Sequence, residues 1–137
     1  MVQGEDMKSF NYFIKEQFSI ARVNMPQIDD LEAFKGFVVS QGLDYSVNTD
    51  TVSHINPLQS VGEDEYKIRN ICMSIRKDPD SIVDMKPIIV SDDGYVIDGH
   101  HRYYAAIRED VKIPYIVIHT TANKLLKIAY EFTTNNY

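Results

Sequence analysis

Apolar residues recur at helical spacing in several stretches of the chain. The clearest stretch is residues 63–77, where Ile68, Ile71, Cys72 and Ile75 are spaced i, i+3, i+4 and i+7. Such spacing places the apolar side chains on one face of a helix. Similar patterns predict four further helices, over residues 9–17, from Asp29 or Asp30 to Gly42, and over residues 101–108 and 122–132.

Short apolar runs between these helices predict the strands. Residues 87–90 and 95–97 flank Ser91-Asp92-Asp93-Gly94, and an Asp-Gly pair between apolar runs favours a hairpin. Residues 113–118 are apolar on both faces, so we expect a central strand there. Two more strands are predicted, over residues 18–23 and within residues 45–55. The pattern indicates an α+β fold, with one small mixed β-sheet and helices packed against it.

Length and composition limit the class of protein. The 137 residues suffice for one compact unit, which we divide into a helical extension (1–44) and a domain (45–137). The 44% hydrophobic content supports a real core. The single cysteine, Cys72, excludes an internal disulfide and a thiolate metal cluster. We expect a cytoplasmic protein, in the host cytoplasm if the source is viral, because the sequence has neither a signal peptide nor a membrane span.

The charge distribution bears on the kind of ligand. The net charge of −6 excludes a strongly basic coat for nucleic acid. Residues 1–60 carry 4 basic and 8 acidic groups, whereas residues 61–137 carry 10 and 12. An anion site is therefore expected in the second half of the chain.

The segment Asp98-Gly99-His100-His101-Arg102 holds the most informative chemistry. It lies where a predicted strand turns into a predicted helix, and the first turn of a helix attracts anions through its unpaired N–H groups. Gly99 lets a ligand approach the backbone, and the next three side chains add donors. Asp98 supplies a carboxylate that could accept a hydroxyl proton or bind Mg²⁺, and the two histidines are further catalytic candidates.

Simpler interpretations of the same residues remain open. The glycine could serve only the turn, one histidine could belong to the core and the other to the surface, and Arg102 could form a structural bridge with Asp98 or Glu109. In the helix over residues 63–77, three polar residues share one face and could reach a nucleotide or simply face solvent. These residues are Lys67, Asn70 and Ser74.

Two stretches resemble the sulfiredoxin/ParB superfamily. INPLQSVGEDEYKIRNICMSIRKDPDSIVDMKPIIV is similar to the sulfiredoxin segment that runs from Pro-Leu-Pro-Ser-Val through a helix to Ile-Arg-x-Asp-Pro-Asp-Ser. VIDGHHRYYAAIRED resembles the sulfiredoxin Gly-Gly-Cys-His-Arg-Tyr-x-Ala motif and the Gly-x-x-Arg box of ParB-type domains. Together they cover about residues 55–118, and they imply a sulfiredoxin/ParB-like fold.

The resemblance also implies roles for single residues. Gly99, His100, His101 and Arg102 would hold nucleotide phosphates. Lys67 would match the family's helix lysine near the phosphates, while Asn70 and Ser74 would match its polar positions beside the nucleoside.

Departures from the sulfiredoxin pattern limit the activities that the chain could have. His100 stands where sulfiredoxin has its reactive cysteine, and Asn56 replaces an arginine that contacts phosphate. Cys72 lies on an apolar stripe and is interpreted as a core residue. Sulfinic acid reduction is therefore excluded.

The form Asp-Gly-His-His-Arg is closer to the free-serine kinases of the superfamily and to phage and plasmid proteins labelled ParB-like nucleases. In the kinases an acidic residue near the box activates the hydroxyl, and Asp98 matches it. A second family carboxylate lies upstream, where Glu63, Asp64 or Glu65 could supply it.

Three functions follow as hypotheses. The first is an enzyme that transfers a phosphoryl group from ATP or ADP, with Mg²⁺, to a hydroxyl of a small alcohol such as serine or of a hydroxymethylated base in DNA. The second is a ParB-like nuclease or DNA-processing NTPase, in which a histidine assists cleavage. The third is a non-enzymatic, nucleotide-dependent interaction module. Residues 8–44 carry no chemical motif, and we expect them to cover the site or shape its acceptor side.

Overall fold

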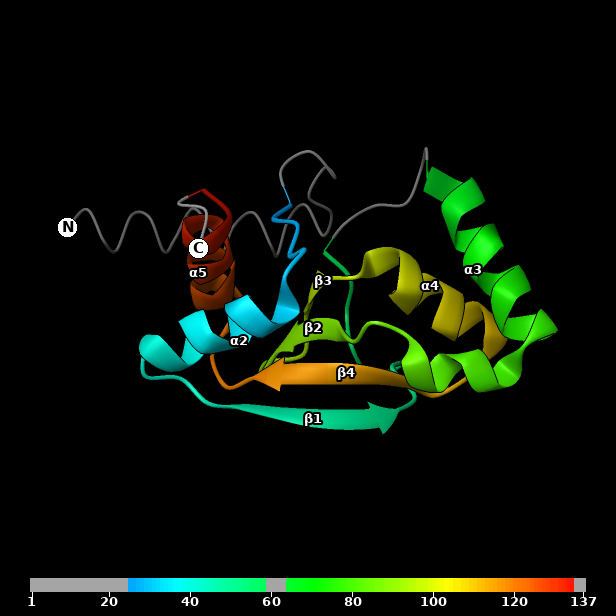
Figure 1. The fold of residues 1–137 in the computed structure, drawn as a ribbon, viewed down its shortest axis with the longest axis horizontal. Helices are drawn as coiled ribbons and strands as arrows, with labels where there is room; N and C mark the ends of the chain where they lie inside the picture. Colours follow the sequence, from blue (N-terminus) through cyan, green and yellow to red (C-terminus); the bar gives the residue numbers. More distant parts are fainter. Residues whose placement is uncertain (1–24, 59–63, 135–137) are drawn as a thin grey trace.

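The computed structural model describes residues 25–58 and 64–134 (Figure 1). Four strands form one sheet in the order β1-β4-β2-β3. Strands β2 and β4 are parallel, whereas the β1–β4 and β2–β3 pairs are antiparallel, so the sheet is mixed. The strands are β1 (Tyr45–Asp50), β2 (Ile88–Ser91), β3 (Val96–Asp98) and β4 (Ile113–Ile118). The structure confirms the predicted α+β class, the hairpin and the central position of β4.

Helices cover both faces of the sheet. They are α2 (Leu31–Ser40), α3 (Glu65–Lys77), α4 (His100–Glu109) and α5 (Ala122–Thr134), with a 3-10 helix, η4 (Pro79–Asp84), after α3. Ile89 packs in the core that α2 and α5 share, while Ile88 and Val90 pack in the core on the α4 side. This alternation follows from the period of two along a strand. The helix and strand predicted over residues 9–17 and 18–23 lie outside the described residues.

Helix α2 begins and ends where the sequence predicts. The Asp30 carboxylate caps it by accepting a hydrogen bond from the Ala33 N–H at 3.0 Å, and Gly42 follows its end with φ +81°. Phe34 is fully buried and meets Phe132 of α5 edge to face, with 5.2 Å between ring centroids. The described part of the predicted extension is thus part of the same core as the sheet.

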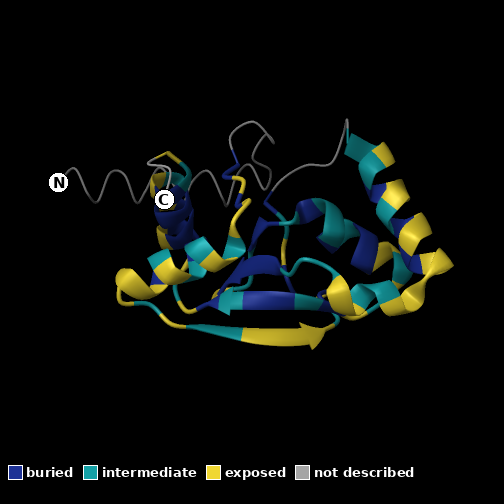
Figure 2. Ribbon diagram, viewed as in Figure 1, coloured by how far each residue is buried: buried dark blue, intermediate teal, exposed yellow. Residues whose placement is uncertain are grey.

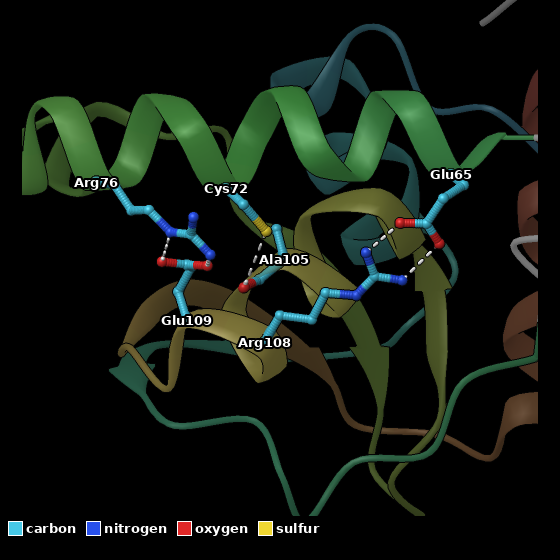
Figure 3. A network of polar contacts seen from close by, with 6 residues as sticks. All are labelled: Glu65, Cys72, Arg76, Ala105, Arg108 and Glu109. Carbon is cyan, nitrogen blue, oxygen red and sulfur yellow. Dashed lines mark hydrogen bonds and ion pairs between the residues drawn. The ribbon is translucent and has the colours of Figure 1, made fainter.

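Helix α3 packs against α4 on the side of the molecule away from α2 and α5 (Figure 1). Figure 3 shows this contact from close by. Ile68, Cys72 and Ile75 of α3 pack with Ala105 of α4 in a separate small core. Ion pairs flank this core on both sides, as Figure 3 shows: Arg76 binds Glu109 through two hydrogen bonds of 2.8 Å, and Arg108 binds Glu65. The apolar stripe of α3 therefore faces α4. Cys72 lies on this stripe and is a core residue, as predicted.

Burial decreases from the centre of the sheet towards its β1 edge (Figure 2), while the other edge strand, β3, is buried. Strand β2 is buried throughout, while β1 is exposed over its last four residues, including Val47. In the ranges 25–58 and 64–134, no helix has the length and apolar character needed to cross a bilayer.

Candidate functional site

The turn from β3 into α4 forms the centre of the candidate site. Asp98 ends β3, Gly99 caps α4, and the Gly99 carbonyl accepts a 2.9 Å hydrogen bond from the Tyr103 N–H. The backbone at Gly99 has φ +95°, a left-handed conformation that favours glycine. A Cβ at this position would lie 2.6 Å from Ile88 Cγ2 and 2.6 Å from Arg102 Nη2. Space and backbone conformation therefore both require glycine here.

A cavity of about 190 Å³ lies beside this turn. Residues 26–29 form one wall, residues 97–102 form another, and Lys86 completes the lining. Pockets for drug-sized ligands usually have volumes of about 300–1,000 Å³. The cavity has the size for phosphate groups or a small acceptor, so the nucleoside of a bound nucleotide would lie outside it.

Asp98 is a buried carboxylate at the cavity wall. Its Oδ1 accepts a 3.4 Å hydrogen bond from the Ile28 N–H, and its Oδ2 lies 3.6 Å from Arg102 Nη2. Burial raises the pKa of Asp98 above its usual value, although the nearby Arg102 charge acts in the opposite direction. A raised pKa makes the carboxylate a better proton acceptor for a substrate hydroxyl.

Arg102 is the cation nearest to Asp98, and its guanidinium is incompletely paired. Nη2 donates a long hydrogen bond of 3.5 Å to the Pro87 carbonyl, and burial lowers the pKa of Arg102 from its usual value. The buried Nε–H has no acceptor among the described residues. A buried donor without a partner costs about 1–3 kcal/mol, so an anionic oxygen placed here would relieve that cost.

His100 has a structural partner inside the protein. Its Nε2 accepts a 3.0 Å hydrogen bond from the Leu58 N–H, which assigns the ring proton to Nδ1 when the ring is neutral. The side chain is buried, and this burial lowers the pKa of His100 to about 3. The ring is therefore neutral at physiological pH. A neutral ring offers phosphate no charge attraction, which disfavours the phosphate-binding role that the resemblance implies for His100.

His101 connects the cavity to α3. Its Nε2 lies 3.2 Å from Asp64 Oδ2 at the start of α3, although the two groups are not aligned as a hydrogen bond. Of the three candidates for the upstream carboxylate, Asp64 is thus the one beside a cavity residue. Glu65 is engaged with Arg108, and Glu63 lies outside the described residues.

The structure does not bring Lys67, Asn70 and Ser74 to the cavity. They do share one face of α3, as predicted, but this face lies beside the buried stripe of Ile68, Cys72 and Ile75 and away from the cavity lining. Asn70 and Ser74 are exposed and line a separate open hollow on α3. The solvent-facing interpretation of this face therefore agrees better with the structure than the nucleoside-binding one.

Sequence reasoning missed six residues that line the cavity, namely Pro26, Gln27, Ile28, Asp29, Lys86 and Ile97. One signal could have located Lys86. In the β2–β3 hairpin, Ile89 pairs with Asp98, so the residues just before β2 must lie beside those just after β3. No comparable signal connects Ile28 to Asp98, because 70 residues separate them.

The residues present are compatible with a phosphate-bound Mg²⁺ ion. The described ranges contain no group of three metal-binding side chains. Mg²⁺ in phosphoryl-transfer sites, however, takes one or two carboxylates and completes its shell with phosphate oxygens and water. Asp29 and Asp98 both line the cavity and can supply those carboxylates.

The cavity therefore combines groups that bind an anion with a group that can accept a proton. Arg102, Lys86 and the start of α4 are groups that can attract an anion, and Asp98 lines the same cavity. No protein-family profile matches the sequence, and no curated protein is detectably similar to it.

Proposed function

We propose that the chain is a nucleotide-dependent phosphotransferase with a sulfiredoxin/ParB-like fold. It would move a phosphoryl group from ATP or ADP to a hydroxyl acceptor, either a small alcohol such as serine or a hydroxymethylated base in DNA. The observation that supports this proposal best is the joint placement of Asp98, Gly99 and Arg102 on one small cavity. A phosphate site with an adjacent carboxylate of raised pKa suits phosphoryl transfer to an alcohol.

Phosphate binding rests on the first turn of α4 and on Arg102. The unpaired N–H groups of a helix N-terminus and its partial positive charge favour phosphate oxygens. Gly99 leaves room for the Arg102 guanidinium against the turn, and the unpaired Arg102 Nε–H adds a charged donor. These groups position the phosphates and spread the negative charge that develops during transfer.

Asp98 performs the proton transfer in this proposal. The acceptor oxygen attacks the terminal phosphorus, its proton passes to the Asp98 carboxylate, and the bond from phosphorus to the nucleotide's bridging oxygen breaks. Mg²⁺ bound with the nucleotide would neutralise phosphate charge, and Asp29, which also lines the cavity, would hold it while Asp98 takes the proton. His101, beside Asp64, lines the same cavity and helps to hold the polar ligand.

The state of His100 favours this function over the nuclease hypothesis. A cleavage mechanism that uses His100 as a proton donor needs a protonated ring near neutral pH. The pKa of about 3 and the hydrogen bond from Leu58 oppose that state. The interaction-module hypothesis, in turn, gives no role to the raised pKa of Asp98.

Asp98→Asn tests the proposal. We expect turnover to fall by about 10²- to 10⁴-fold, the usual contribution of a general base, while nucleotide affinity changes little. The variant should be at least as stable as the parent at pH 7. The reason is that a raised pKa in the folded state stabilises the protein only at low pH, and this effect is lost as the pH rises through that pKa.

Asp92→Asn is the matched control, because Asp92 is an exposed turn carboxylate that pairs only with the ring of His119 in the described structure. Phosphoryl transfer from ATP and ADP would be followed with serine and with a hydroxymethylated oligonucleotide as acceptors. Full turnover in Asp98→Asn would contradict the role of Asp98, and no turnover of any acceptor by the parent protein would contradict the proposed activity.

A further inference from the structure

Lys86 lines the cavity, although the resemblance assigns it no role. It directly precedes Pro87 and β2, is half-buried, and lines the cavity together with Gly99 and Arg102. The β2–β3 register places it beside the turn into α4. Its neighbour Pro87 contributes the carbonyl that accepts the long hydrogen bond from Arg102. Lys86 and Arg102 thus lie on the same cavity and come from adjoining parts of the chain.

The ammonium group of Lys86 has unused capacity for an anion. Its Nζ donates to the carbonyl oxygen of Ile28, which is a neutral acceptor. No carboxylate of the described residues lies within ion-pair distance of it. An ammonium has three N–H donors, so Lys86 can keep the bond to Ile28 and still donate to a ligand oxygen.

Arg102 and Lys86 both act on the Asp98 carboxylate, and Arg102 acts on it more strongly. The Arg102 Nη2 lies 3.6 Å from Asp98 Oδ2, so part of the arginine charge is already balanced inside the protein. A nucleotide brings several negative charges to the cavity, and one partly balanced arginine would neutralise them poorly. Lys86 is the second cation on the same wall and can balance a further phosphate charge.

From these contacts we propose that Lys86 is a second phosphate-binding cation of the cavity. The inference rests on the proposed function and assigns to Lys86 the task that the family resemblance implied for Lys67. Lys67 does not line the cavity, and its Nζ lies 6.0 Å from the centre of the Tyr66 ring on the same helix. Lys86 reaches the cavity from the start of β2 instead.

The same lysine connects the ligand to the wall formed by residues 26–29. Charged cavity residues hold both backbone polar groups of Ile28. Its N–H donates to Asp98, and its C=O accepts from Lys86. The Ile28 side chain is buried in the core with α2 and α5. Loss of Lys86 would therefore weaken phosphate binding directly and would also loosen this wall.

Calorimetric titration with inorganic pyrophosphate and with ATP tests the inference. Lys86→Gln should weaken binding by about tenfold to a hundredfold, the range expected for a charged hydrogen bond. Lys86→Arg should bind within a few-fold of the parent, because it keeps the charge. Lys124→Gln, an exposed lysine on α5, is the matched control and should bind like the parent.

A second measurement separates phosphate binding from support of the wall and needs no variant. Acetylation of the parent protein with a lysine-reactive reagent, read by mass spectrometry, should be slowed at Lys86 by pyrophosphate and unchanged at Lys67. Equal acetylation of Lys86 with and without bound pyrophosphate would overturn the inference, as would protection of Lys67 instead.

The outcomes also separate this inference from the proposed function. If Arg102→Ala loses pyrophosphate binding and Lys86→Gln keeps it, the role of Lys86 is overturned and the phosphate site stands. If the parent protein binds neither pyrophosphate nor ATP, both are overturned. If binding depends on Lys86 but no hydroxyl acceptor is phosphorylated, the inference holds and the proposed activity fails.

Discussion

Gly99→Ala is the substitution whose cost the structure defines most closely. Two separate effects act at this position. The backbone has φ +95°, and a left-handed conformation costs a residue with a Cβ roughly 1–2 kcal/mol. The new methyl group would also lie 2.6 Å from Ile88 Cγ2 and from Arg102 Nη2, well inside van der Waals contact.

The two contacts differ in what can move. Arg102 Nη2 is the end of a flexible side chain and can turn away, but the guanidinium then leaves its place in the cavity. Ile88 is fully buried in β2 and cannot move without disturbing the core. Overpacking of a core costs about 1–3 kcal/mol, so we expect Gly99→Ala to lower the free energy of unfolding by about 2–5 kcal/mol in all.

Gly94→Ala is the matched control. Gly94 has φ +88°, but a Cβ there would have no atom within 4 Å. Only the backbone term of roughly 1–2 kcal/mol applies. The difference between the two variants therefore measures the contact with Ile88 and Arg102 alone.

Urea unfolding at pH 7, monitored by circular dichroism, gives the free energies when the m-values of parent and variants agree. Pyrophosphate titration of the same samples reports the displacement of Arg102, and Gly99→Ala should bind more weakly than Gly94→Ala. Equal stability of the two variants would refute the steric argument at Gly99. Unchanged pyrophosphate binding by Gly99→Ala would refute the placement of Arg102.

Two further predictions concern buried titratable groups. Burial lowers the pKa of His100 from 6.5 to about 3, so the folded state takes up a proton less readily than the unfolded chain, and stability should fall as the pH decreases from about 6.5 towards 3. His100→Gln removes this proton uptake, and its unfolding free energy should fall less steeply over that range; identical slopes would contradict the burial of a neutral ring. Burial also raises the pKa of the Cys72 thiol, so its reaction with a thiol reagent at pH 7.4 should be slower in the folded protein than in urea. Equal rates would show that α3 does not bury Cys72 against α4.

The elements that the sequence predicts well are those with local signals. The Asp30 cap and Gly42 define α2, the Asp-Gly turn defines the β2–β3 hairpin, and the double-sided apolar run defines β4. Each signal lies within a few residues of the structure that it specifies. The 3-10 helix η4 has no such signal in the apolar spacing.

The candidate site was predictable only in part, because it is assembled over long distances in sequence. The Asp98–Arg102 turn is local and is found from its motif. The wall that carries Ile28 comes from 70 residues upstream of Asp98, and the burial of Ile28 beside α2 together with its hydrogen bonds to Asp98 and Lys86 holds it there. Local periodicity carries no information about such a pairing.

The polar face of α3 illustrates a different limit. Helical spacing correctly placed Lys67, Asn70 and Ser74 on one face, but the resemblance directed this face towards the ligand. Packing decides the orientation of α3, because its apolar stripe with Cys72 must face α4. The three polar residues lie outside that stripe and therefore do not face α4. The same stripe was visible in the sequence and could have corrected the assignment.

The central claim is that the Asp98–Arg102 turn binds the phosphates of a nucleotide, and one measurement tests it most directly. ATP and ADP, each with Mg²⁺, would be titrated by calorimetry into the parent protein and into Arg102→Ala. We expect saturable binding to the parent and an affinity about tenfold to a hundredfold lower in the variant, since a charged donor to phosphate is lost. Equal binding by the two proteins, or no binding of either nucleotide to the parent, would contradict the claim.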